Sequence, residues 1–123
     1  MSGKIVVLDF EAGYPTAAEA KRRLPIELDL ARRNGVAVVK IIHGYGSSGK
    51  GGKLRSSIRS ALAQYRHAGA VGRVVFGEAW SIFDESTRAL LERYPKLRGD
   101  RDLERSNPGI TIMEVAREPS KVV

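Results

Sequence analysis

Two short apolar runs separated by a segment of helical spacing constrain the fold more than any other feature of this sequence. The runs are Ile5–Phe10 and Val36–Ile42, and each has the length of a buried strand. Between them, apolar residues recur every three or four positions through residues 20–31, and Thr16 followed by Glu19 predicts a capping box. A helix that joins two strands is a crossover, so we expect a parallel βαβ unit.

The same reading of periodicity and turn signals predicts the remaining elements. They are a helix from Leu54 to Gly69, a strand Val71–Phe76, a helix Ser81–Tyr94 capped by Ser81 or Asp84, a surface loop Lys96–Pro108, a strand Ile110–Val115 and a flexible tail at residues 117–123. Pro25 lies inside the first helical pattern and lacks a backbone donor, so we expect a kink or a restart there. The order predicts one α/β domain over residues 1–116, with residues 79–108 as an extra helix and loop.

Length and composition exclude several classes of protein. The chain has 123 residues, the usual length of one domain. It has no cysteine, which excludes a disulfide-built module and a cysteine zinc site. No apolar run is long enough to span a bilayer, and the first residues lead into a strand without a signal-peptide pattern. We therefore expect a soluble, cytoplasmic protein with no membrane partner, and the oligomeric state stays open.

The formal charge of +7 is concentrated in one part of the sequence. The chain has 21 lysines and arginines against 14 acidic residues, yet no Asp or Glu occurs between Leu30 and Gly77. A surface of one sign attracts polyanions, and nucleic acid is the commonest of these, so DNA or RNA is the predicted partner. A solvated basic face without a partner is the alternative. The cations of the segment are Arg32, Arg33, Lys40, Lys50, Lys53, Arg55, Arg59, Arg66 and Arg73.

A glycine-rich loop, residues 43–52, lies between the second predicted strand and the second predicted helix. Gly44, Gly49 and Lys50 have the spacing of a P-loop, but Gly51 stands where that motif needs Ser or Thr to hold Mg²⁺. Glycines nevertheless let a backbone approach an anion, and the helix that follows adds the positive end of its dipole. The loop therefore predicts phosphate binding. A nucleotide-binding or protein-interaction module and a plain connector remain alternatives.

The stretch Val39–Ile58 resembles the signature of the Smr (small MutS-related) domain family: a strand, His-Gly-x-Gly, a glycine-rich segment, then Leu-Arg opening a helix. Leu8-Asp9-Phe10 resembles the opening of the family's first motif, and residues 109–115 resemble its closing strand. The resemblance implies a small two-layer βαβαββ sandwich with a mixed sheet, similar to the C-terminal domain of bacterial translation initiation factor three. It also implies binding of DNA or RNA, and several members of the family are nicking or RNA-cleaving endonucleases.

The resemblance and the charge pattern together predict which residues bind nucleic acid. The loop and the start of the second helix would contact the phosphodiester backbone. The candidates are His43, Gly44, Gly46, Lys50, Lys53, Arg55 and Arg59.

Asp9, Glu11 and His43 are candidate catalytic residues for the alternative function, a metal-dependent endonuclease. Asp9 and Glu11 are two positions apart at a strand end, so both point the same way and could hold Mg²⁺ or Mn²⁺. His43 could transfer protons near neutral pH. However, the family usually has His or Arg where Glu11 stands. In the alternative interpretation Asp9 caps or hydrogen-bonds the glycine-rich loop, Glu11 is a solvated turn residue or pairs with Arg55, and His43 bonds a backbone carbonyl.

Overall fold

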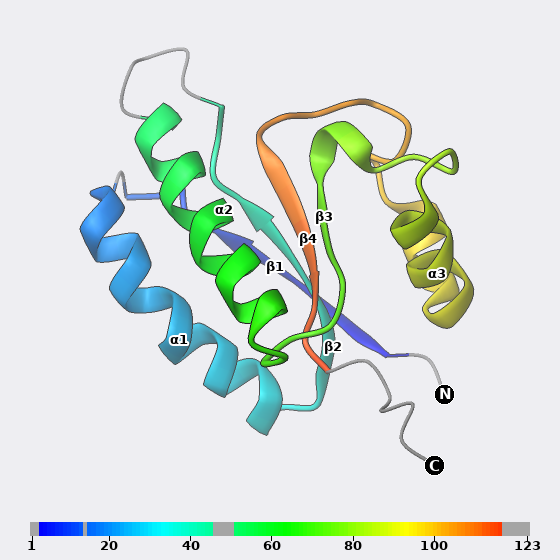
Figure 1. Cartoon of the computed structure of the whole chain (residues 1–123), viewed down its shortest axis with the longest axis horizontal. Helices are drawn as coiled ribbons and strands as arrows, with labels where there is room; N and C mark the ends of the chain where they lie inside the picture. Colours follow the sequence, from blue (N-terminus) through cyan, green and yellow to red (C-terminus); the bar gives the residue numbers. More distant parts are fainter. Residues whose placement is uncertain (1–2, 14, 46–50, 117–123) are drawn as a thin grey trace.

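The computed structural model describes residues 3–13, 15–45 and 51–116, and a four-stranded mixed sheet lies at its centre (Figure 1). The strands are β1 (Lys4–Asp9), β2 (Val36–Ile42), β3 (Val74–Phe76) and β4 (Ile110–Glu114), in the order β1-β2-β4-β3. β1 pairs with β2 in parallel, and β4 is antiparallel to both β2 and β3. This confirms the predicted α/β fold and its parallel βαβ unit. The predicted tail, residues 117–123, lies outside the described residues.

Two amphipathic helices, α1 (Ala17–Arg33) and α2 (Gly51–His67), lie side by side on one face of the sheet (Figure 1). The predicted capping box is present at the start of α1. The backbone amide of Glu19 donates to Oγ1 of Thr16, and the amide of Thr16 donates to Oε1 of Glu19, both at 3.1 Å. In the part of the chain that the structure describes, no helix is long and apolar enough to cross a membrane.

α1 runs through Pro25 without a break, so the predicted restart there is wrong. Pro25 is exposed, while Leu24 and Leu28 on either side of it are buried in the core beneath the helices. Their packing on the sheet keeps the two halves of the helix on one face, and this outweighs the loss of one backbone donor.

The second face of the sheet is covered by the segment between β3 and β4. This segment contains α3 (Glu85–Arg93), whose N-terminus is capped by Asp84, and short 3₁₀ turns at Gly77–Ala79 and Pro95–Gly99. Trp80 is fully buried there, and its indole Nε1 donates to Oδ2 of Asp100 at 3.0 Å. Residues 77–108 therefore add a third layer to the two-layer sandwich. The predicted surface loop that starts at Lys96 contains part of this core, because Leu97 is buried.

The third strand is shorter than the predicted Val71–Phe76, because regular pairing begins only at Val74. Val71 packs in the core under α1 and α2, whereas Val75 packs in the core under α3. Residues four apart in a regular strand share one face, so the chain between Val71 and Val75 is irregular. The amide of Gly72 still donates to the carbonyl of Glu114, at 2.9 Å, which ties this irregular stretch to β4.

Candidate nucleic-acid interface

The carboxyl ends of β1 and β2 meet at one edge of the sheet, close to the start of α2 (Figure 1). Asp9 pairs with Ile42 in the β1–β2 register, so the residues after each strand lie at this same edge. The structure therefore places Glu11, His43 and Gly44 at the same edge of the sheet. Two predicted contact residues, Gly46 and Lys50, lie outside the described residues.

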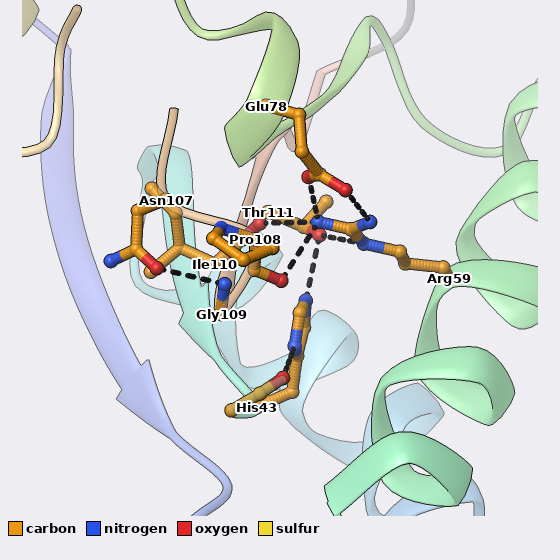
Figure 2. A network of polar contacts seen from close by, with 9 residues as sticks. His43, Arg59, Glu78, Asn107, Pro108, Gly109, Ile110 and Thr111 are labelled. Carbon is orange, nitrogen blue, oxygen red and sulfur yellow. Dashed lines mark hydrogen bonds and ion pairs between the residues drawn. The ribbon is translucent and has the colours of Figure 1, made fainter. Parts of the chain in front are cut away.

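His43 is fully buried, and both nitrogens of its ring have hydrogen-bond partners (Figure 2). Nδ1 is 2.8 Å from the carbonyl oxygen of Gly44, and Nε2 is 2.9 Å from Oγ1 of Thr111. Because a carbonyl can only accept, Nδ1 carries the proton and Nε2 accepts from the hydroxyl of Thr111. The predicted bond to a backbone carbonyl is confirmed.

Burial lowers the pKa of His43 from 6.5 to about 4. The bond to the Gly44 carbonyl favours the charged ring, but the positive charges of Arg59 and Arg55 add to the effect of burial. His43 is therefore neutral at neutral pH. A neutral, enclosed ring with both nitrogens bonded fixes the conformation of the loop that follows β2.

Arg59 of α2 is the centre of the same network (Figure 2). Its Nε donates to Oγ1 of Thr111 at 3.1 Å, and its two terminal nitrogens bind the carboxylate of Glu78 at 2.9 and 2.6 Å. One of them also donates to the carbonyl of Ile110 at 3.0 Å, and the guanidinium stacks on the ring of Phe76. The side chain is only 11 % exposed. Arg59 thus joins α2 to β4, and Glu78 compensates its charge.

The backbone amides at the start of the glycine-rich loop are also engaged. The amides of His43 and Gly44 both donate to the carbonyl of Gly109, at 3.0 and 3.1 Å. Gly44 has a φ of +73°, and a Cβ at this position would lie 2.5 Å from Oε2 of Glu11. The positive φ therefore favours glycine here, since the exposed side chain of Glu11 could move away from a Cβ, and the amide of Gly44 holds the loop to the residue before β4.

Asp9 and Glu11 differ in what they contact. Oδ1 of Asp9 accepts from the amides of Glu11 and Ala12, at 2.8 and 3.1 Å, so this side chain shapes the turn after β1. Glu11 is exposed, and its carboxylate lies against Gly44. Among the described residues, no group of three or more His, Cys, Asp or Glu side chains could hold a metal ion. The pair of carboxylates for Mg²⁺ or Mn²⁺ stays a prediction: Oδ1 of Asp9 is bonded within the turn, and Glu11 is exposed.

Lys53 and Arg55, in the first turns of α2, differ from Arg59 in having no partner for their side chains among residues 3–13, 15–45 and 51–116. No hydrogen bond or ion pair within the described residues involves either side chain, and Lys53 is exposed. Arg55 precedes Arg59 by one helical turn, and its charge lowers the pKa of both His43 and Glu78. This electrostatic effect locates the guanidinium near the loop, at the edge where the two parallel strands end.

Two residues of the network were not predicted from the sequence, although each had a signal in it. Thr111 is a polar residue in the apolar run of the last strand, and it is fully buried. Glu78 is the first acidic residue after the acid-free segment. A buried polar group needs a partner, so Thr111 could have been expected to face another polar side chain.

The family model of the Smr domain matches residues 13–80, more than half of the chain. That range includes α1, β2, the His43–Gly44 segment and α2. Among solved structures, the Smr domain of Thermus thermophilus MutS2 is similar, with 23 % sequence identity and a TM-score of 0.50. The match covers 94 % of this chain and 99 % of that one and shows a common fold. No curated protein sequence matches the chain. On the family match, the chain belongs to the Smr domain family.

Proposed function

We propose that this Smr domain binds DNA or RNA through the sugar-phosphate backbone, using Lys53 and Arg55 beside the His43–Gly44 segment. The observation that carries the proposal is the contrast among the cations of the acid-free segment. Lys40 pairs with Asp100 and Asp102, and Arg59 pairs with Glu78. Lys53 and Arg55 have no such partner in the described part of the chain, and unpaired cations at one edge attract phosphates.

The position of these two cations supports phosphate binding over a general surface charge. Both lie in the first turns of α2, where an α-helix has amides without intrahelical partners and the positive end of its dipole. The first turn of α2 contains no acidic residue. Gly46 and Lys50 of the same loop belong to the proposed contact set by their resemblance to the family motif.

The other predicted residues support the site from within. His43, Thr111 and Arg59 form a chain of hydrogen bonds that joins the end of β2 to β4 and α2. Gly44 is held by the carbonyl of Gly109. In this proposal they position the loop, and the phosphate contacts are made by Lys53 and Arg55.

The geometry favours binding over the alternative, cleavage of the phosphodiester. A nuclease built on His43 needs a ring nitrogen that can exchange a proton with the substrate, and both nitrogens are bonded inside the protein. With a pKa near 4, this ring is also a weak base. Neither Asp9 nor Glu11 lies in a cluster of three metal-binding side chains among the residues the structure describes.

A binding titration tests the proposal. Fluorescently labelled DNA and RNA are titrated with the wild-type chain and with the double variant Lys53→Ala, Arg55→Ala. A matched control is Lys96→Ala, Arg98→Ala, because it removes the same two residue types from an exposed part of the other layer. The proposal expects loss of affinity in the first double variant only.

A further inference from the structure

A groove opens next to the His43–Gly44 segment, on the face of the sheet that α1 and α2 leave free. It has a volume of about 400 Å³ and lies between the end of β2 and the segment that leads into β4. A second, more open hollow of about 630 Å³ continues from it. The side chains that line both parts are Tyr45, Arg101, Asp102 and Asn107.

The acidic residues of the wall that leads into β4 are all bonded within the protein. Asp100 and Asp102 both bind the buried ammonium of Lys40, with N–O distances of 2.8 and 2.5 Å. The carboxylate of Glu104 accepts from the hydroxyl of Ser81 and from the amide of Ile82, at 2.7 Å each. Lys40 therefore compensates Asp100 and Asp102, whereas the carboxylate of Glu104 is exposed and bonded to neutral groups, and it lines neither hollow.

The arginines of the same wall differ from these acids. Arg101 and Arg105 alternate with these acids in the sequence, and both are exposed. Neither guanidinium group has a hydrogen bond or ion pair with another residue of the described ranges. The segment 100–106 has a formal charge of −1, but of its charged residues that line the two hollows, Asp102 is paired with Lys40 while Arg101 and Arg105 are exposed.

The two walls of the groove are joined, so its shape is set before anything binds. Oδ1 of Asn107 accepts from the amide of Gly109 at 2.8 Å (Figure 2). The carbonyl of Gly109 in turn accepts from the amides of His43 and Gly44. In the same segment Glu104 and Ser106 have φ values of +68° and +53°. Residues other than glycine rarely adopt this backbone conformation. The hydrogen bonds around the segment therefore determine its path.

Tyr45 adds an aromatic surface beside these arginines. It is 56 % exposed, and its ring lies close to Gly109, where a Cβ would be 3.2 Å from Cδ1 of Tyr45. An exposed ring can stack on a base, and bases are available for stacking only where the strand is unpaired. Arginines beside such a ring bind the phosphates on either side of the base.

We propose that Tyr45, Arg101 and Arg105 form a subsite for an unpaired nucleotide, next to the backbone site of Lys53 and Arg55. The inference rests on the proposed function and extends it to a substrate class, single-stranded nucleic acid. Glu11 lies at the far end of the groove from Arg105 and repels phosphate, which directs the strand toward the arginines. Tyr45 lies within the residues matched by the family model, whereas Arg101 and Arg105 lie outside them.

The test compares three labelled probes at one salt concentration: oligodeoxythymidylate, oligouridylate and a blunt DNA duplex. The variants are Tyr45→Ala, Tyr45→Phe and the double variant Arg101→Ala, Arg105→Ala, with Lys96→Ala, Arg98→Ala as the charge-matched control. Tyr45→Ala and the Arg101, Arg105 variant are expected to lose affinity for a single strand on the order of tenfold. Tyr45→Phe keeps the ring and should bind as the wild type does. Binding of the blunt duplex should change no more than it does in the control.

The outcomes separate this subsite from the function on which it rests. Equal losses on the single strands and the duplex would overturn the subsite, because they would show only a general effect of charge. Wild-type binding of every probe by Tyr45→Ala would also overturn it. If Lys53→Ala, Arg55→Ala still binds all three probes normally, it is the backbone site that fails. A preference of the wild type for one of the two single strands that Tyr45→Ala loses would support the subsite.

Discussion

Nε2 of His43 lies 2.9 Å from Oγ1 of Thr111, a residue 68 positions later in the chain. The hydroxyl donates to the ring and in turn accepts from Nε of Arg59, at 3.1 Å. Three elements, β2, β4 and α2, are thus connected through one buried hydroxyl. The conformation of the family's His-Gly motif in this protein depends on a threonine that the family model does not reach.

The first prediction concerns the protonation state of His43. Because Nδ1 donates to a carbonyl and Nε2 accepts, the ring should be the neutral Nδ1-protonated tautomer at neutral pH. Its titration midpoint should lie near 4 instead of 6.5. Nitrogen-15 NMR of labelled histidine measures both properties. A midpoint above 6, or the Nε2-protonated tautomer, would contradict this arrangement.

The same group makes the stability of the fold depend on pH. The unfolded chain takes up a proton at His43 near pH 6.5, whereas the folded chain takes it up only near pH 4. Folding is therefore favoured most above pH 6.5, and stability falls as the pH decreases toward 4, by up to about 3 kcal/mol from this residue. Urea denaturation of the wild type and of His43→Gln measures the effect. His43→Gln should lack this part of the decrease in the free energy of unfolding. If the free energy falls with pH to the same extent in both proteins, the buried neutral His43 is not the cause of the decrease.

Lys40 provides a prediction about the segment that forms the third layer. Its ammonium is 7 % exposed and binds both Asp100 and Asp102. Lys40→Met leaves two partly buried carboxylates without a cation, so we expect the free energy of unfolding to fall by about 3 kcal/mol. Chemical denaturation measures the change, with Lys96→Met as the exposed control. A loss as small as that of the control would show that the ion pairs do not hold this segment.

The sequence predicted most of the fold because the strands and helices at its centre have clear periodicity. The run Val36–Ile42 became β2 without a change in bounds, and the Thr16 capping box was correct to the residue. The predictions failed where tertiary packing outweighs local pattern. Pro25 does not interrupt α1, and Leu97 in a charged stretch is buried.

The candidate site could be predicted only in part, because acidic residues far away in the sequence can lie next to a basic segment in the folded protein. The segment from Leu30 to Gly77 lacks acids, but acids from later in the chain pair with two of its cations. Glu78 compensates Arg59, and the carboxylates of the segment before β4 compensate Lys40. No local pattern reveals such long-range pairs. Arg101 and Arg105 were not predicted because Asp100, Asp102 and Glu104 stand beside them, so this stretch of the sequence shows no excess of positive charge.

A substitution of Glu11 distinguishes a site that only binds nucleic acid from a site that also needs a divalent metal ion. It lines the groove as an exposed carboxylate, so Glu11→Gln should raise affinity for nucleic acid by about twofold to fivefold by removing repulsion. Fluorescence anisotropy without divalent ions measures this. If Glu11 is a metal ligand, the same change should instead abolish any increase in affinity that Mg²⁺ or Mn²⁺ gives to the wild type.

A cleavage assay tests the part assigned to His43. The account expects that purified protein binds supercoiled DNA and structured RNA but does not cut them, with Mn²⁺ or with EDTA, because neither ring nitrogen of His43 faces outward. Gel electrophoresis of the products is the measurement. Cutting that disappears in Asp9→Ala and His43→Ala, with both variants folded by circular dichroism, would show that the domain is a nuclease.

The most direct test of the central claim is the salt dependence of nucleic-acid binding by Lys53→Ala, Arg55→Ala. If both side chains contact phosphates, the slope of log affinity against log salt should become shallower by about 2, and affinity at low salt should fall on the order of tenfold. Lys96→Ala, Arg98→Ala carries the same net charge and should keep the slope of the wild type. Identical slopes and affinities for the two double variants would contradict the claim that the backbone site lies at the start of α2.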